Sequence, residues 1–164
     1  ILSSAFFVAS LIHVPIGPSS AHLVLNGLLG VMLGWAAFPA IFVALALQAL
    51  LFQFGGLTVL GVNTFNMALP PVLCFYAFRP MLSGPSRLRG GAAFACGFLS
   101  VGASALLTAV SLGMSGEAFI PAARALMLAH IPVMIAEGVV TALVVSFIAR
   151  VRPEMLVFTS TAHG

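Results

Sequence analysis

The chain has 164 residues, of which 62% are hydrophobic and 5% are charged. Soluble domains carry about 25% charged residues, and the mean hydropathy of this chain is +1.22. So few polar groups cannot cover a water-exposed globule, and lipid must therefore solvate most of the surface. These numbers exclude a soluble enzyme. The apolar runs are continuous, which favours helices over a barrel, because barrel strands alternate apolar and polar residues.

The charged residues are six arginines and three glutamates, with no lysine. The calculated isoelectric point of 9.7 reflects arginines at membrane edges. No basic patch is interleaved with aromatic residues, so we expect no nucleic-acid partner. Cys74 and Cys96 lie inside apolar runs, where a thiol serves as a small apolar side chain, and they form no disulfide framework.

The apolar runs predict an all-α integral membrane protein with about six transmembrane helices in a single domain, residues 1–164. Segments rich in Pro and Gly separate the runs. Because the sequence begins at Ile1 rather than at Met, we expect native residues before it, and no basic segment or cleavage site marks a signal peptide. The expected helices cover about 1–13, 21–35, 38–54, 63–82, 89–112 and 118–149.

The arginines predict the orientation. Five of the six lie in two places: three flank the loop after the fourth helix and two follow the last helix. Cytoplasmic loops of membrane proteins carry an excess of Arg and Lys, so both places are expected to be cytoplasmic. Tracing backwards, the loop at 13–20 is then external. The five residues are Arg79, Arg87, Arg89, Arg150 and Arg152.

Small residues recur at every fourth position of the helix expected at 89–112. Such stripes let membrane helices approach closely. Two interpretations stay open: packing within this chain, or contact with a partner membrane subunit. The stripe comprises Ala92, Cys96, Ser100, Ser104 and Thr108.

Polar side chains gather on the expected external side. His13 and His22 bracket the first loop, and Asn26 follows His22 by four residues, which places both on one helix face. Asn63 and Asn66 open the fourth helix and share a face. Imidazole is a common ligand of nickel and cobalt, and amides orient such ligands from outside, so the histidines are candidate metal ligands and the asparagines their supports. The alternative is that each histidine caps or packs locally.

His130 and Glu137 lie seven residues apart on one face of the last helix, within the bilayer. Ionisable residues inside a membrane are costly and mark function or structure-fixing bonds. This intramembrane polar pair could form an ion path, or it could hydrogen-bond other helices to fix a kinked segment.

Three blocks resemble one family in order. They are Ile12-His-Val-Pro-Ile-Gly-Pro-Ser-Ser-Ala-His-Leu23, Gly55-Gly-Leu-Thr-Val-Leu-Gly-Val-Asn-Thr-Phe-Asn-Met67 and His130-Ile-Pro-Val-Met-Ile-Ala-Glu-Gly138. They resemble the substrate-binding membrane subunit of cobalt and nickel energy-coupling-factor transporters, the CbiM/NikM family. The likeness spans nearly the whole chain.

The resemblance implies seven helices, of which this chain would hold the last six. It also implies a mature N-terminus that begins Met-His. In the family, the terminal amine, a backbone nitrogen and the imidazole of that segment bind the metal, and a histidine from the first external loop joins them. His22 matches the loop histidine. With no Met-His end in the sequence, we expect no cofactor in this chain alone; the transported ion, Co²⁺ or Ni²⁺, would bind once that end is present.

As a function, the resemblance implies capture of a divalent ion outside the cell and release inside. Energy would come from partner ATPases through a transmembrane coupling subunit, and a small accessory membrane protein is a further possible partner. The expected location is the cytoplasmic membrane of a bacterium or archaeon. No nucleotide-binding loop GxxxxGK[ST], metalloprotease HExxH or GxSxG motif occurs, which agrees with a non-enzymatic subunit.

Two other classes stay open. A haem-binding redox subunit needs histidines in mid-helix on facing helices, and His130 alone meets that condition. A membrane scaffold without a ligand is the second, and metal binding by the full-length protein would separate it from a transporter.

Overall fold

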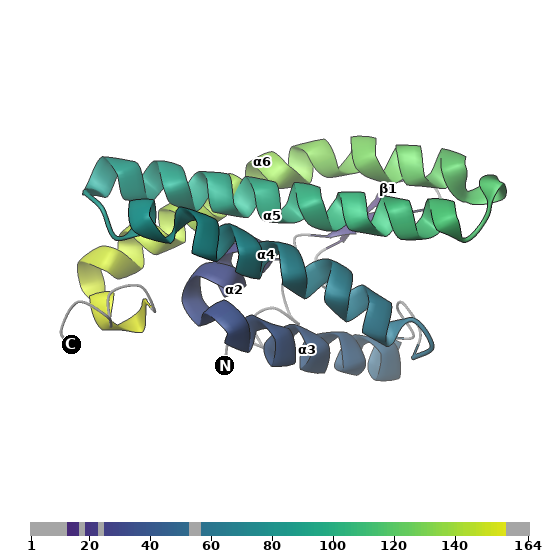
Figure 1. Cartoon of the computed structure of the whole chain (residues 1–164), viewed down its shortest axis with the longest axis horizontal. Helices are drawn as coiled ribbons and strands as arrows, with labels where there is room; N and C mark the ends of the chain where they lie inside the picture. Colours follow the sequence, from purple (N-terminus) through teal and green to yellow (C-terminus); the bar gives the residue numbers. More distant parts are fainter. Residues whose placement is uncertain (1–12, 17–18, 23–24, 53–56, 157–164) are drawn as a thin grey trace.

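The computed structural model describes residues 13–16, 19–22, 25–52 and 57–156 (Figure 1). A two-stranded hairpin precedes a bundle of helices, and short 3-10 turns join or end some of them. The order is β1 (His13–Ile16), β2 (Ser19–His22), α2 (Asn26–Leu33), η1 (Gly34–Ala36), α3 (Ala37–Phe52), α4 (Leu60–Leu82), α5 (Ser86–Met114), η2 (Glu117–Phe119), α6 (Ile120–Val151) and η3 (Pro153–Met155).

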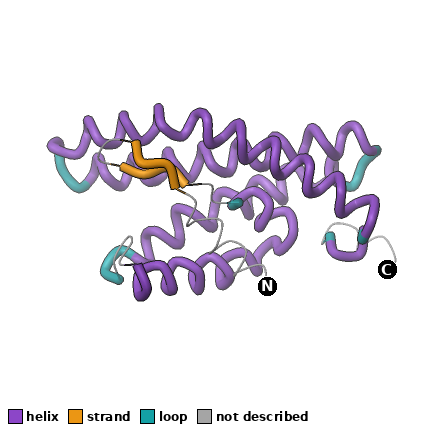
Figure 2. Tube along the Cα trace, turned by 180° about the vertical axis from the view of Figure 1, so that it is seen from behind, coloured by secondary structure: helices purple, strands orange, loops and turns teal. Residues whose placement is uncertain are grey.

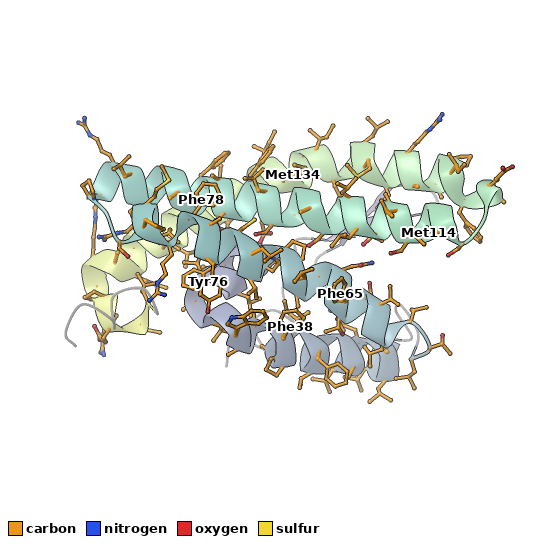
Figure 3. All side chains as sticks on the ribbon, viewed as in Figure 1. Phe38, Phe65, Tyr76, Phe78, Met114 and Met134 are labelled. Carbon is orange, nitrogen blue, oxygen red and sulfur yellow. The ribbon has the colours of Figure 1, made fainter. Side chains whose placement is uncertain are left out.

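The long helices α5 and α6 lie side by side along the length of the molecule (Figures 1 and 2). Small residues bring them together. A Cβ atom added at Gly97 would lie 2.8 Å from the Glu137 carbonyl oxygen, and one at Gly138 would lie 3.0 Å from the Phe94 carbonyl oxygen. Met134, labelled in Figure 3, fills the space over Gly102 of α5. Close approach of backbones is what drives helix association where the solvent is itself apolar.

Helices α2 and α4 form a second layer against α5, and α3 packs on α4 on the side away from α5 (Figure 1). One apolar cluster joins Leu29 of α2, Ile41 of α3 and Val72 of α4. A second cluster joins Phe75 of α4 to Cys96 of α5 and Val145 of α6. The core therefore runs as two patches along the bundle and connects both layers.

The small-residue stripe of α5 faces the inside of this chain. Ala92, Cys96, Ser100 and Ser104 are buried, and Ser100 lies beside the thiols of Cys74 and Cys96. Thr108 is half-buried and donates its hydroxyl to the Ser104 carbonyl. Four of the five stripe residues are therefore used for internal packing and Thr108 alone keeps exposed surface, so a partner contact at this stripe stays a prediction.

The predicted fold needs two corrections. The segment expected to be a loop at 13–20 contains a short hairpin of two four-residue strands, and the all-α fold class is confirmed for the described remainder. The helix expected at 21–35 begins at Asn26, because β2 extends to His22. The helices expected at 38–54, 63–82, 89–112 and 118–149 appear as α3, α4, α5 and α6. The helix expected at 1–13 lies outside the described residues except for His13, which is in β1.

Large apolar side chains cover the outside of the bundle. Leu128, Leu143 and Phe147 of α6 are each 65% or more exposed, as expected for a surface in contact with lipid rather than water. Among the described residues, three segments are long and apolar enough to cross a membrane: Asn26–Leu51, Ser86–Met114 and Glu117–Val151. The count of six spans is not confirmed and stays a prediction.

Replacement of Gly97 by Ala should destabilise the protein. The new methyl group would lie 2.7 Å from Thr141 Oγ1 and 2.8 Å from the Glu137 carbonyl oxygen, so α5 and α6 must separate. Overpacking of this kind costs about 1–3 kcal/mol. The matched control is Gly91→Ala in the same helix, where nothing lies within 4 Å of the added Cβ. The control should be neutral or stabilising, since Ala is the better helix former. Thermal unfolding in detergent measures both, and equal melting temperatures would contradict the packing described.

Candidate functional site

The hairpin brings the two candidate metal-binding histidines together. His13 and His22 are directly opposite each other in the antiparallel register of β1 and β2, a pairing in which Cα atoms are about 4.5–5.5 Å apart. The sequence placed them on the two sides of a loop, nine residues apart. The hairpin lies along the half of α6 that follows the α5–α6 connection (Figures 1 and 2), and β2 contacts α6.

The start of α2 follows the hairpin closely. Leu25 caps this helix in a left-handed conformation, with φ 53° and ψ 25°. It is the one non-glycine residue with positive φ in the described part of the chain. Such a backbone costs on the order of 1–3 kcal/mol and persists only where its surroundings enforce it. The Leu25 N–H donates to Glu137 Oε2 of α6 at 3.0 Å.

The next two residues are held by α5. Asn26 is buried, and its Nδ2 donates to Ser104 Oγ at 3.4 Å. Gly27 packs directly on Gly97, because an added Cβ would lie 2.3 Å from the Gly97 Cα. Three successive residues at the start of α2 are therefore fixed by the two long helices.

Asn26 and His22 do not share a helix face, because His22 ends β2 and Asn26 begins α2. That expectation was wrong. The physical reason is the left-handed turn at Leu25, which separates strand from helix. Asn26 still lies close to the hairpin in sequence and belongs to the structure that follows it.

His130 and Glu137 bond to different elements. His130 is half-buried, and its Nδ1 lies 2.7 Å from the Leu126 carbonyl oxygen, which fixes Nδ1 as the protonated nitrogen. Glu137 is fully buried and accepts from Leu25. The two are separated by two helical turns, roughly 10 Å along α6. The two side chains therefore bond to different partners rather than to each other. The hydrogen bond from Leu25 fits the interpretation of Glu137 as a link to another helix, here α2.

Asn63 and Asn66 lie in the first two turns of α4. Asn66 is buried and donates from Nδ2 to Ser111 Oγ of α5 at 3.1 Å, while Asn63 is half-buried. Asn66 therefore joins α4 to α5 at the end of α5 near Met114 (labelled in Figure 3). Their role around a bound metal stays a prediction.

The donor set of the described residues is incomplete for a transition metal. No group of three or more His, Cys, Asp or Glu side chains gathers in that part of the chain. Two neutral imidazoles suit Ni(II) or Co(II) but fill only half of a four-coordinate site. Further nitrogen ligands would have to come from other residues.

Sequence patterns missed the contact between Leu25 and Glu137. Neither an apolar leucine nor its spacing to residue 137 marks a helix cap. The one signal was a lone carboxyl inside an apolar run, which indicates a specific partner without naming it.

Fold and surface together define a polytopic membrane helix bundle with a histidine-bearing hairpin at one side. The family model for the cobalt uptake substrate-specific transmembrane region matches residues 1–155. The chain therefore belongs to this family, as its three sequence blocks predicted, and the family is one of cobalt and nickel transport proteins of the membrane.

Relatives carry related descriptions. A putative metal transport protein of Haemophilus influenzae is 40% identical over 95% of this chain and 77% of its own length. The cobalt transport protein CbiM of Kyrpidia tusciae is 31% identical over 94% of this chain and 67% of its own length. The chain spans about half of a putative fused nickel transport protein NikMN of Archaeoglobus fulgidus, with 34% identity over 95% of this chain and 54% of that protein.

Two solved structures share the fold. The crystal structure of a transition metal transporter superposes with a TM-score of 0.81 and 32% identity, covering 99% of this chain and 80% of that one. The crystal structure of a truncated transition metal transporter superposes with a TM-score of 0.74 and 31% identity, covering 93% of this chain and 77% of that one.

Proposed function

We propose that the chain is the substrate-binding component of an energy-coupling-factor importer for divalent cobalt or nickel. It captures the ion on the external side of the cytoplasmic membrane and releases it to the cytoplasm. The observation that carries the proposal is the register of the hairpin, which sets His13 directly opposite His22 within the block that resembles the family's metal loop.

The pairing supports the proposal because residues directly opposite each other in an antiparallel ladder have Cα atoms about 4.5–5.5 Å apart. Imidazole nitrogens favour Ni(II) and Co(II), and all-nitrogen sites distinguish poorly between the two. The resemblance supplies the remaining ligands from a Met-His N-terminus: its amine, a backbone nitrogen and its imidazole. His22 holds the position of the loop ligand, and His13 stands beside it.

In this proposal the hairpin lies on the external side, and the distribution of charged and aromatic residues supports that orientation. The α4–α5 connection and the end of α6 lie at the same end of the molecule (Figure 1), and they carry the five clustered arginines. Trp35 and Tyr76 lie near each other, with ring centroids 6.2 Å apart, and both are exposed; Tyr76 is labelled in Figure 3. Tyr and Trp concentrate at membrane interfaces, and arginines on the cytoplasmic side.

Partner subunits supply the energy in this proposal, since the sequence holds no nucleotide-binding loop. They are a transmembrane coupling subunit and cassette ATPases, with a small accessory membrane protein as a further partner. The exposed apolar faces of α3 and α6 are available to them or to lipid, whereas all of the α5 stripe except Thr108 is buried within this chain. No observation favours a haem subunit: in the described helices His130 is the one histidine, and its Nδ1 is bonded to its own helix.

Replacement of His22 by Ala in the full-length protein should abolish high-affinity metal binding. Removal of a direct ligand should cost more than the 10–100-fold that loss of an outer partner costs. Isothermal titration with Ni²⁺ and Co²⁺ measures the affinity. His163→Ala removes an imidazole near the other end of the sequence and serves as the control, with wild-type affinity expected. An unchanged affinity for the His22 variant would remove this residue from the ligands.

Cysteine labelling should place the α4–α5 connection and the chain after α6 in the cytoplasm. Ser83→Cys and Ser160→Cys, in a background without Cys74 and Cys96, should resist an impermeant maleimide in intact cells and react after permeabilisation. The physical reason is the positive charge at both places. Labelling of either site from outside would overturn the orientation and the external position of the hairpin.

A further inference from the structure

We propose that Glu137 is a positioning residue for the metal site: its carboxyl group on α6 fixes Leu25, the residue before α2 and three residues after His22. The inference rests on the proposed function, because it concerns the geometry of the His22 ligand. In this inference the buried Glu137 carboxyl sets the position of the hairpin relative to α6.

The first observation is where the carboxyl lies and what it touches. Glu137 is fully buried in the middle of an apolar, membrane-spanning helix, where an ionisable side chain is costly. Its Oε2 accepts the Leu25 backbone N–H at 3.0 Å, across 112 residues of sequence. In lipid this N–H has no water to bond, so a protein acceptor decides where it can lie.

The second observation is the backbone that the hydrogen bond holds. Leu25 has a φ of 53°, a left-handed conformation that a branched apolar residue adopts only under constraint. The side chains of α2 supply no cap for this N-terminus. Leu25 lies three residues after His22, so a fixed Leu25 limits how far the end of β2 can lie from α6.

The third observation is that the residues after Leu25, at the start of α2, are held in place by α5. Asn26 is bonded to Ser104, and Gly27 packs on Gly97 without room for a methyl group. The start of α2 is therefore fixed to α5, and the carboxyl on α6 fixes the residue before it. With one side anchored, loss of the Glu137 bond should show itself on the hairpin side, at His22.

A metal site needs its ligands held within about 0.5 Å, which their supporting contacts provide. Glu137 supports His22 through the backbone rather than by touching the ion. The position and the accepting oxygen of its side chain then matter more than its charge. A positioning role therefore predicts an order of metal affinities among Glu137 variants that differs from the order predicted by a role for its charge.

The experiment measures Ni²⁺ affinity of the full-length protein for four variants. Glu137→Gln keeps side-chain length and an accepting oxygen, Glu137→Asp keeps the carboxyl but draws it back by one methylene, and Glu137→Leu removes the acceptor. Thr141→Val is the control, one turn further along α6: Thr141 is equally buried, and its hydroxyl has no hydrogen-bond partner among the described residues, so an isosteric replacement removes no bond seen there. Hydrogen exchange at the Leu25 amide and thermal unfolding are measured on the same samples.

We expect Gln and the Thr141 control to bind within about 3-fold of wild type, and Asp and Leu to bind roughly 10–100-fold more weakly, as for loss of an outer partner. The Leu25 amide should exchange faster in the Asp and Leu variants only.

If the Glu137→Asp variant binds Ni²⁺ better than Glu137→Gln, the carboxyl acts through its charge, and the positioning role is wrong. If Leu lowers the melting temperature while its folded fraction binds Ni²⁺ with wild-type affinity, Glu137 is structural only. If the Glu137→Leu variant does not fold, the relative Ni²⁺ affinities of Glu137→Asp and Glu137→Gln still decide between positioning and charge. Absence of binding by the wild type would instead refute the proposed function.

Discussion

The close approach of α2, α5 and α6 at Gly27 and Gly97 is the contact on which the rest of the arrangement depends. A methyl group at either glycine would overlap a neighbouring helix, and in lipid, packing of this kind replaces the hydrophobic force that holds soluble bundles together. Because the backbones meet here, Leu25 can reach Glu137 and Asn26 can reach Ser104. The polar contacts are a consequence of the glycine contact, and the place of the hairpin follows from them.

The same constraint explains which polar residues lie inside. Asn26 and Glu137 each bond to another helix or to the turn at its start, while Asn66 ties α4 to α5. Within a membrane, such bonds join elements at single points and leave the apolar faces free for lipid. The described part of the bundle is thus a rigid centre around α5 with apolar outer surfaces on α3 and α6.

Much of this could be predicted from the sequence, for identifiable reasons. Long apolar runs broken by Pro and Gly gave the helices from α3 to α6, and the three sequence blocks gave the family, which the match over residues 1–155 confirms. The hairpin was missed because a short run with Pro15, Gly17 and Pro18 resembles a loop. The Leu25 turn was missed because its conformation is imposed by α6, which no local pattern records. The metal ligands stay predictions, since the described residues bring together no group of three or more His, Cys, Asp or Glu side chains.

The position of Glu137 also bears on how a bound ion could be released. A site that captures scarce metal must be distorted before it lets go, and a partner shifts that equilibrium only if it binds one arrangement better than the other. In the importer we propose, the outer face of α6 is exposed at Leu128, Leu143 and Phe147. On its buried face, Glu137 accepts the hydrogen bond from the Leu25 backbone N–H. A partner bound to the outer face could displace α6 by a small amount against the anchored start of α2. Because Gly27 fixes α2 to α5, that displacement would act on the Leu25 bond and so on His22, which makes α6 the element through which force could reach the metal site.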